Sequence, residues 1–284
     1  MKILLTGSSG FFAKEFIKYA SYDKRYKLFC ITRKRIKTEN IKYWQIDLSK
    51  KKIRKYPQKR RFDLVLHSSF VRKKKDESQI VYENFNITKN LIQILKKNYF
   101  KKIINISSAS LYHNKDGKFS ENNDVYFSEN NDNFYGLSKY FTEMMFNSYL
   151  NKKKIIHLRV GNIIGNDKDK SIVSEMKRDL KSKNKIEIYG NGKRVLNLIH
   201  IKSLIQYIFL IFKKKTYGVF NISDYSINLK KIAELIKSKY GSNKSRLFFK
   251  KKYTKNPRFN LVTTKFFNLI KKKKLIDKEL FYEI

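Results

Sequence analysis

A glycine-rich turn between an apolar strand and a helix, at the start of the chain, constrains the fold more than any other feature. Lys2–Thr6 is typical of a buried strand, and residues 10–19 are typical of a helix. Gly7 can adopt backbone angles that a side chain forbids, and Gly10 allows a pyrophosphate to approach the backbone. The small Ala13 lets the helix pack near the strand. Because a helix N-terminus attracts phosphate, the turn predicts a dinucleotide site, with an ordinary tight turn as the alternative.

Apolar strands and amphipathic helices alternate along the first half of the chain, which implies βαβ units and a parallel sheet covered on both faces. We predict an α/β fold, a Rossmann-type doubly wound parallel sheet with a smaller C-terminal α/β substrate-binding lobe. Residues 1–165, completed by about 196–224, would form the dinucleotide-binding domain, and 166–195 with 225–284 the lobe. The predicted strands are 2–6, 26–32, 41–46, 63–67, 101–107 and 154–160, and the predicted helices are 10–19, 79–97, 135–150, 170–183 and 229–240.

Further motifs follow the glycine turn in order along the chain. They are Asp47-Leu48, Asp63-Leu-Val-Leu-His67-Ser-Ser69, Asn84-Phe-Asn86-Ile-Thr-Lys-Asn-Leu91 and Leu158-Arg-Val-Gly-Asn-Ile-Ile-Gly165. Together with the turn, they resemble the signatures of extended short-chain dehydrogenases, the NAD-dependent epimerase/dehydratase family, with Ala13 in place of a last glycine. The residues that we expect to bind the cofactor are Gly7, Ser9, Gly10, Phe11, Phe12, Arg33, Asp47, Leu48, His67, Asn86, Ser107, Tyr135 and Lys139.

Tyr135 and Lys139 are four residues apart on a predicted helix, so their side chains share one face. A free tyrosine, with a pKa of about 10, is a poor base at neutral pH, but a nearby ammonium group favours the phenolate. Tyr135 can then exchange a proton with a carbinol while hydride passes to or from a nicotinamide. The resemblance implies that Lys139 holds the nicotinamide ribose, that Ser108 bonds the substrate oxygen and that Ser110 is a second contact. Capping of the strand end is the alternative for both serines.

The residues after Ser108 narrow the reaction. The resemblance implies that a 4,6-dehydratase carries an Asp-Glu pair directly after the catalytic hydroxyl group. Here Ala109 and Ser110 hold those positions, and neither can act as a general acid or base at neutral pH. Dehydration is therefore disfavoured, whereas epimerisation and keto reduction remain open because both need only hydride transfer and the Ser/Tyr/Lys set.

The end of the second strand indicates which dinucleotide to expect. An acidic residue there bonds the ribose 2′-OH of NAD, whereas an arginine accommodates the 2′-phosphate of NADP. The strand is followed by Arg33-Lys34-Arg35, with no acidic residue before Glu39. We therefore favour NADP over NAD and predict reduction of a 4-keto sugar, with an NAD-dependent 4-epimerase as the alternative. A simpler interpretation is that Arg33 and Arg35 are two more cations in a lysine-rich chain.

The substrate side is predicted from Tyr189-Gly-Asn-Gly192 and Asn197-Leu-Ile-His200, which resemble the part of the family fold that holds the nucleotide of a nucleotide-sugar. Leu196, Asn197 and Ser203 depart from the family, which has Arg or Asp there. Arg194 and Arg258 could bind a diphosphate, because guanidinium groups make bidentate phosphate contacts. The expected substrate contacts are Ser69, Ser108, Ser110, Asn162, Arg194 and Arg258. The four histidines lack metal-ligand spacing, so no metal is predicted.

The formal net charge of +41, from 65 Lys+Arg and 24 Asp+Glu, raises the possibility of a nucleic-acid partner. The lysine runs are spread along the whole chain, and the abundant Lys, Ile, Asn, Phe and Tyr all have A/T-rich codons. We therefore interpret the charge as compositional drift and expect no nucleic-acid partner. Two less favoured functions are a nucleic-acid binder with salt-dependent affinity and a dinucleotide sensor without catalysis. The intact Ser108, Tyr135 and Lys139 argue against the sensor.

Apolar segments bear on the compartment. The run at residues 1–5 stops at Thr6-Gly7, too early for a signal peptide, and the stretch 204–212 is shorter than the roughly 20 residues that span a bilayer. The single Cys30 excludes an intramolecular disulfide and suits a reducing compartment. We expect a cytoplasmic enzyme, and the resemblance implies a homodimer formed through the Tyr/Lys helix and its neighbour.

Overall fold

The structure is a computed structural model that describes residues 1–34, 41–72, 76–112, 115–125, 133–165, 169, 171–251 and 257–272. By its internal contacts the chain divides into two compact units. The first contains residues 1–113, 124–159 and 208–220, and the second contains 114–123, 160–207 and 221–284. This grouping places 114–123 and 196–207 in the second unit, unlike the domain borders expected from the sequence, which stay a prediction.

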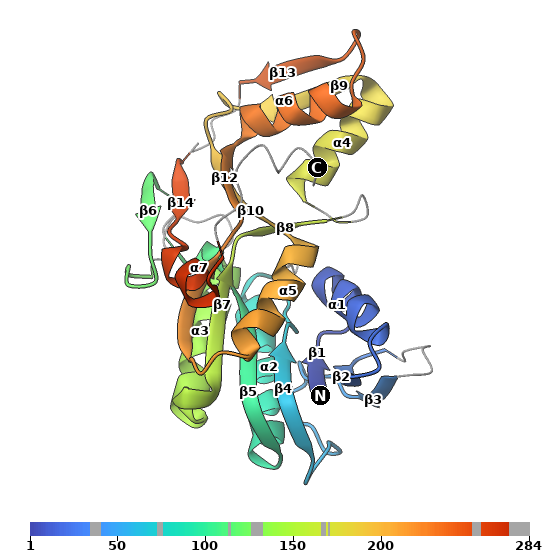
Figure 1. The fold of residues 1–284 in the computed structure, drawn as a ribbon, viewed down its shortest axis with the longest axis vertical. Helices are drawn as coiled ribbons and strands as arrows, with labels where there is room; N and C mark the ends of the chain where they lie inside the picture. Colours follow the sequence, from blue (N-terminus) through green and yellow to red (C-terminus); the bar gives the residue numbers. More distant parts are fainter. Residues whose placement is uncertain are drawn as a thin grey trace. The chain divides into compact units, whose positions relative to one another are not determined.

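The first unit is built on a seven-stranded sheet with the order β11-β7-β5-β4-β1-β2-β3 (Figure 1). Neighbouring strands from β3 to β5 pair in parallel. The middle residues of the central strands are apolar and buried, as Ile3–Leu5 in β1 and Leu64–Leu66 in β4 show, which is expected for a parallel sheet covered on both faces. The strands are β1 (Lys2–Thr6), β2 (Lys27–Thr32), β3 (Ile41–Gln45), β4 (Arg61–His67), β5 (Tyr99–Ser108), β7 (Ile155–Val160) and β11 (Gly218–Ile222).

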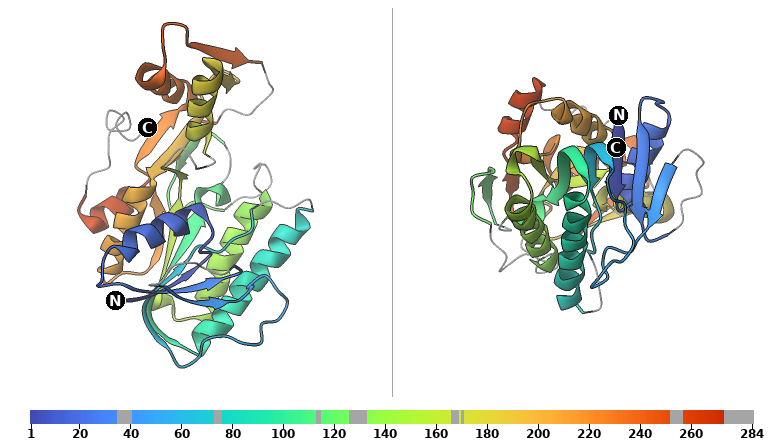
Figure 2. Two further views of the ribbon diagram at one scale, coloured as in Figure 1. Left: turned by 90° about the vertical axis from the view of Figure 1, so that its right-hand side faces the viewer. Right: turned by 90° about the horizontal axis from the view of Figure 1, so that it is seen from below.

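Helices cover both faces of this sheet (Figure 2). On one face lie α2 (Ser78–Lys96) and α3 (Asn133–Tyr149), whose apolar side chains join those of β1, β4 and β5 in one core cluster. On the other face α1 (Phe11–Ser21) packs against the end of α5 (Ile201–Phe212), where the rings of Phe16 and Phe209 stack at 5.6 Å. Burial of these apolar stripes, rather than helix propensity, holds the helices in place. The predicted Rossmann-type α/β fold is confirmed.

The strand order reverses between β1 and β4, because the chain adds β2 and β3 on one side of β1 and then returns to add β4 on the other. In open parallel sheets, ligands bind beyond the carboxyl ends of the strands at such a reversal. Here those ends carry the turn Gly7–Gly10, after β1, and the segment Ser68–Phe70, after β4. The topology therefore selects the place at which a functional site is to be sought.

The second unit contains three small sheets, with strand orders β12-β10-β8, β13-β9 and β14-β6. Its apolar core joins α4 and α6 with β9, β10 and β12. The elements are β6 (Gly117–Phe119), β8 (Asn162–Ile164), α4 (Ile172–Lys183), β9 (Lys185–Tyr189), β10 (Val195–His200), β12 (Tyr225–Asn228), α6 (Leu229–Tyr240), β13 (Arg246–Lys250), β14 (Phe259–Leu261) and α7 (Thr264–Ile270).

The strands and helices predicted from the alternating pattern are confirmed, with ends that differ by up to two residues. The sequence did not indicate helix α5 or the small sheets. Strand β6 lies in a polar segment, and it pairs in parallel with β14, which is far away in the sequence. Such pairings leave no local pattern, because both strands are only three residues long.

No helix in the described part of the chain is long and apolar enough to cross a membrane. Within the same residues, no group of three or more His, Cys, Asp and Glu side chains could hold a metal ion. His67 and His157 are buried, and burial lowers their pKa values to about 3 and about 4, so both rings are neutral at physiological pH. His113 lies outside the described residues.

Burial of Cys30 leads to a testable prediction for the fold. The thiol lies on β2 with no exposed surface, and burial raises its pKa to about 12. Because the thiolate is the reactive form, we expect a thiol reagent to label the native protein far more slowly than the unfolded protein. Time-resolved labelling with an aromatic disulfide, with and without denaturant, measures this. Full labelling of the native protein within seconds would contradict the buried position of β2.

Candidate dinucleotide and hydride-transfer site

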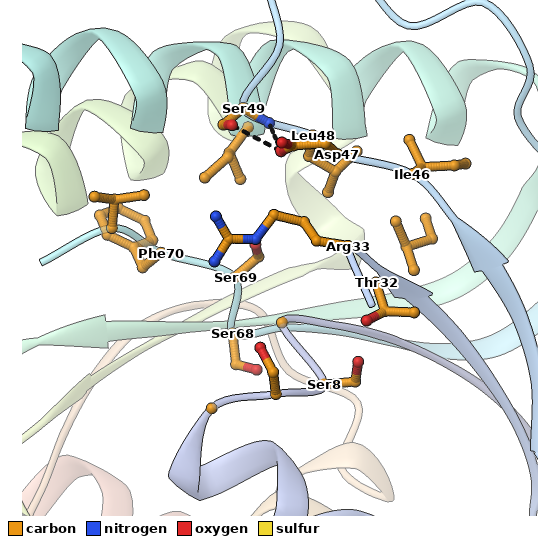
Figure 3. A pocket seen from close by; sticks show the side chains of 16 residues that line it. Ser8, Thr32, Arg33, Ile46, Asp47, Leu48, Ser49, Ser68, Ser69 and Phe70 are labelled. Carbon is orange, nitrogen blue, oxygen red and sulfur yellow. Dashed lines mark hydrogen bonds between the residues drawn. The ribbon is translucent and has the colours of Figure 1, made fainter. Parts of the chain in front are cut away.

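A cavity of about 270 Å³ opens at the reversal point of the sheet (Figure 3). The segments that follow β1, β2, β3 and β4 line it, together with Ile87 of α2. The volume is near the lower end of small-molecule sites, which suits one half of a dinucleotide. The lining segments are Gly7–Gly10, Ile31–Arg33, Ile46–Ser49 and Ser68–Val71.

Gly7 is required where the turns after β1 and β4 come together. Its φ of +78° lies in the left-handed region, and a Cβ atom there would lie 2.7 Å from the backbone of Ser69. The two turns are also joined by hydrogen bonds, since the Ser68 hydroxyl donates to the Thr6 carbonyl at 2.7 Å. The Thr6 hydroxyl in turn bonds Nδ1 of His67 at 2.7 Å. The buried threonine and histidine therefore fix the shape of the turn from beneath.

The residues around the cavity fit a dinucleotide phosphate. Helix α1 begins at Gly10 with no side-chain cap, so its first N–H groups remain available to an anion. Ser8 lines the cavity, and its buried Oγ has no hydrogen-bond partner among the described residues; the same holds for His67 Nε2 and Asn86 Nδ2, which do not line the cavity. Buried polar groups are nearly always bonded, so unpartnered ones at a cavity indicate a ligand or water. Phe11 is half-buried and Phe12 is buried against Phe16, which leaves mainly the backbone of this segment for phosphate contacts.

Arg33 and Asp47 occupy the end of the cavity at β2 and β3. The Arg33 side chain is exposed, and its guanidinium group lies in the cavity (Figure 3). The Asp47 carboxylate accepts bonds from the backbone N–H and the hydroxyl group of Ser49, at 3.0 and 2.7 Å. Asp47 therefore shapes its own turn, while buried Leu48 lines the cavity wall. Arg35 and Glu39 lie outside the described residues.

Tyr135 and Lys139 lie on the inner face of α3, as predicted from their spacing, and the Lys139 Nζ is 5.6 Å from the centre of the Tyr135 ring. A second cation is also close, because the Arg72 guanidinium carbon lies 5.1 Å from the same ring centre. The ring of Phe70 meets the Tyr135 ring edge-on, with centroids 5.7 Å apart. Two positive charges therefore face this tyrosine, and the sequence had indicated only one of them.

Lys139 is buried, and its Nζ donates to the carbonyl oxygen of Ile106 at 2.6 Å. The same nitrogen lies 3.6 Å from the centre of the Phe70 ring, a short cation–π contact. Burial lowers the pKa of Lys139 to about 7, Glu143 opposes this shift and Arg72 reinforces it. The ammonium group is thus held at the strand end in an environment where its charge is sensitive to its neighbours.

Ser107 and Ser108 end strand β5, and their side chains have different partners. Ser107 Oγ donates to the Glu143 carboxylate at 2.5 Å, deep in the protein. Ser108 Oγ accepts from the Ser110 N–H at 3.1 Å and thereby caps the short helix η1 (Ala109–Leu111). The capping role that the sequence left open is thus present for Ser108. Ser108 Oγ also donates to Ser110 Oγ at 3.1 Å, so its hydroxyl hydrogen has to turn away from Ser110 to bond a ligand.

Gly136 explains how α3 approaches the end of β5 so closely. A Cβ atom at this position would lie 2.5 Å from the carbonyl oxygen of Ser110. No side chain fits there, so the residue directly after Tyr135 has to be glycine if η1 is to touch the helix. Sequence reasoning assigned no role to Gly136, Phe70, Arg72 or Glu143. The four-residue step from Lys139 to Glu143 was a signal for Glu143, because it places both on one helix face.

Asn162, Arg194 and Arg258, three of the remaining predicted substrate residues, belong to the second unit. Asn162 is exposed and its Nδ2 donates to the Asn197 carbonyl at 3.3 Å, while Arg194 and Arg258 are exposed. Asn197, which replaces the family's Asp, is buried and structural. Its side chain bonds Ser226 Oγ and the backbone of Phe259 and Leu261, each at 2.9 Å. It therefore ties β14 to β10. Ser69 and Ser110 are half-buried residues of the first unit.

The contact of Gly7 with the Ser69 backbone predicts the effect of a single methyl group. We expect Gly7→Ala to weaken dinucleotide binding at least about tenfold, because the turn has to open to admit Cβ. Gly218→Ala is the matched control. Gly218 also has a positive φ, +102°, but no atom lies within 4 Å of its Cβ position. Isothermal titration calorimetry with NADPH and NADH measures the two affinities. Equal binding by wild type and Gly7→Ala would contradict the role of the Gly7 turn in binding the dinucleotide.

Comparison with known proteins agrees with the fold. No curated protein sequence matches the chain. UDP-glucuronic acid 4-epimerase from Bacillus cereus, solved with UDP-glucuronic acid and NAD, is 20% identical with a TM-score of 0.79, covering 100% of this chain and 97% of that one. ADP-L-glycero-D-manno-heptose-6-epimerase from Helicobacter pylori is 18% identical with a TM-score of 0.76, covering 100% and 96%.

A third solved structure is dTDP-glucose 4,6-dehydratase from Bacillus anthracis in complex with NAD. It is 16% identical with a TM-score of 0.76, covering 100% of this chain and 95% of that one. At these identities the likeness shows a shared fold. The family assignment comes from the sequence itself, because the NAD dependent epimerase/dehydratase family matches residues 3–223. The chain therefore belongs to the NAD-dependent epimerase/dehydratase family of short-chain dehydrogenase enzymes.

Proposed function

We propose that the protein transfers hydride at a carbon of a nucleotide-sugar, and that it most readily reduces a 4-keto sugar. The observation that carries the proposal is the arrangement of Tyr135 and Lys139 on α3 against Ser108 at the end of β5. This group of side chains belongs to the same compact unit as the glycine-rich turn at Gly7. Hydroxyl, phenol and ammonium groups are the set that proton exchange with a carbinol or ketone requires.

Each of the three side chains has a distinct task in the proposed reaction. A bound nicotinamide would supply or accept the hydride. Ser108 turns its hydroxyl hydrogen from Ser110 Oγ to the substrate oxygen and so holds the carbonyl in place. Tyr135 gives its proton to that oxygen as the carbonyl carbon is reduced, and it regains a proton from solvent afterwards. The positive charge of Lys139 stabilises the phenolate that Tyr135 becomes in this step.

Arg33 supports NADP as the cofactor. An arginine at the end of β2 can bind the 2′-phosphate of NADP, and the Arg33 guanidinium group already points into the cavity. A net reductase consumes a reduced dinucleotide in each cycle, and NADPH serves that purpose. Ala109 and Ser110 disfavour dehydration, because no acid or base follows Ser108.

A 4-epimerase that retains NAD is the second candidate. It is favoured by the likeness in fold over the whole chain to the UDP-glucuronic acid 4-epimerase, which was solved with NAD. The same three side chains would serve it, since an epimerase oxidises and re-reduces one carbon. For both candidates we infer that the substrate's nucleotide binds in the second unit, with Asn162, Arg194 and Arg258 as contacts.

A cytoplasmic homodimer is also part of the proposal. Helices α2 and α3 pack side by side and carry exposed apolar residues, among them Tyr82, Met144 and Tyr149 at 54%, 49% and 57% exposure. Apolar side chains that share two adjacent helices are typical of a surface that a partner covers. This agrees with the dimer through the Tyr/Lys helix that the family resemblance implies.

Cofactor preference tests the role of Arg33. We expect Arg33→Ala to weaken NADPH binding by about 10- to 100-fold while NADH binding changes little. The reason is that only NADPH has a 2′-phosphate, which would lose its ion pair with Arg33. Lys34→Ala is the control, since Lys34 is an exposed neighbour that does not line the cavity. Fluorescence titration of each dinucleotide gives the ratio. If Arg33→Ala weakened both dinucleotides equally, the assignment of NADP would be wrong.

A direct assay separates the reductase from the epimerase. Purified protein is incubated with nucleotide 4-keto sugars and NADPH, and we expect the absorbance at 340 nm to fall as the ketone is reduced. Tyr135→Phe should lower kcat by about 10²- to 10⁴-fold, because the proton donor is lost while the ring and its contact with Phe70 remain. An isomerised product with no change at 340 nm would favour the epimerase, and unaltered turnover by Tyr135→Phe would contradict hydride transfer at this site.

A further inference from the structure

A buried carboxylate lies behind the proposed site, one helical turn beyond Lys139. The Glu143 side chain is 3% exposed, and its oxygens accept bonds from Ser107 Oγ at 2.5 Å and from Nη2 and Nε of Arg159 at 2.8 and 3.2 Å. Removing a carboxylate and a guanidinium group from water costs several kcal/mol. An ion pair this deep is therefore weak evidence for stability and calls for a functional explanation.

The contacts of Glu143 connect the elements that carry the proposed chemistry. Two successive residues of β5 have partners on α3. The Ile106 carbonyl accepts from Lys139, Ser107 donates to Glu143, and Ser108 follows as the proposed substrate contact. Two successive turns of α3 are thus fixed to two successive residues of β5, directly before Ser108.

Arg159 extends this connection to the far side of η1. Its Nη1 donates to the Tyr112 hydroxyl at 2.9 Å, and Tyr112 caps the end of η1. Strand β7 is joined in this way to the segment that follows Ser108. Both ends of that segment are therefore held, at one end by Ser107 and at the other by Tyr112, and Glu143 with Arg159 links the two.

The charges around Lys139 give Glu143 a second effect. Burial disfavours the charged form of Lys139, and the nearby Arg72 cation adds to this effect. The Glu143 carboxylate favours the charged form. Among the described residues, the other groups that face Lys139 add no negative charge. They are the neutral His67 ring on β4, the Phe70 ring, the Tyr135 phenol on α3 and the Ile106 carbonyl on β5.

We propose that Glu143 is a positioning residue of the hydride-transfer site, one that fixes the end of β5 against α3 and places a negative charge one helical turn from Lys139. The proposal rests on the function proposed above. Glu143 touches neither substrate nor cofactor in this role, and it acts through Ser107, Arg159 and Lys139. The ion pair is retained, on this account, because an apolar replacement would leave Lys139 without a counter-charge.

The pH profile of kcat tests the proposal with Glu143→Gln, which keeps the size of the side chain and removes its charge. Lys139 acts when protonated, so activity is lost as pH rises through its pKa. Without the carboxylate that pKa falls further, and we expect the basic limb of the profile to move to lower pH by about one unit. At pH 8 kcat should fall about tenfold, while the KM for the sugar changes less than about threefold.

Thr142→Val is the matched control for loss of a buried hydrogen bond on the same helix. Thr142 Oγ1 bonds Thr88 Oγ1 at 2.8 Å and is as deeply buried as Glu143, but it contacts no group of the proposed site. We expect Thr142→Val to lower the melting temperature and to leave the basic limb in place. If Glu143→Gln lowered the melting temperature in the same way and also left the limb in place, its role would be structural and the proposal would be overturned.

Glu143→Asp keeps the test decisive if the glutamine variant does not fold. Its shorter side chain cannot reach Ser107 and Arg159 together, so we expect a lower kcat with the limb at its wild-type position. A wild-type kcat at every pH would overturn the proposal. Failure of the proposed function would give a different result. Wild type and Tyr135→Phe would then show the same turnover, independently of any substitution at Glu143.

Discussion

The close contact between helix α3 and the carboxyl end of strand β5 fixes the groups on which the proposed chemistry depends. Gly136 removes the side chain that would keep the helix away from Ser110. Lys139 then reaches the Ile106 carbonyl, and Glu143 reaches Ser107. Each of these bonds is short and buried, so the helix cannot slide or turn without breaking several at once. The geometry of Tyr135 relative to Ser108 follows from this docking.

The same contact places an unusual density of charge in the interior. Lys139, Glu143 and Arg159 lie within one buried region, and Arg72 adds a further cation beside Tyr135. In such surroundings small changes of charge are strongly felt, since the dielectric constant is far below that of water. A lysine whose pKa is lowered to about 7 by burial can change its charge near neutral pH. That sensitivity suits a group that stabilises a transient phenolate, because perturbed titrations cluster where proton transfer takes place.

The sequence predicted much of the first unit because its signals are local. The turn after β1, the alternating strands and helices, and the spacing of Tyr135 and Lys139 all lie within short windows. Groups that depend on distant parts of the chain were missed. Phe70 and Arg72 reach Tyr135 across the sheet from the end of β4, and Arg159 reaches Glu143 from β7. The pairing of β6 with β14 was missed for the same reason, whereas Asn197 was noticed as a departure but its structural role needed coordinates.

The fate of the nicotinamide hydride tests the central claim most directly. The protein is given a nucleotide 4-keto sugar and NADPH in which both hydrogens at C4 of the nicotinamide ring are deuterium, and the sugar product is analysed by mass spectrometry and NMR. We expect one deuterium at sugar C4 in each product molecule, because the hydride goes to the carbonyl carbon while Tyr135 protonates the oxygen. A reduced sugar that forms without deuterium would rule out hydride transfer from the nicotinamide.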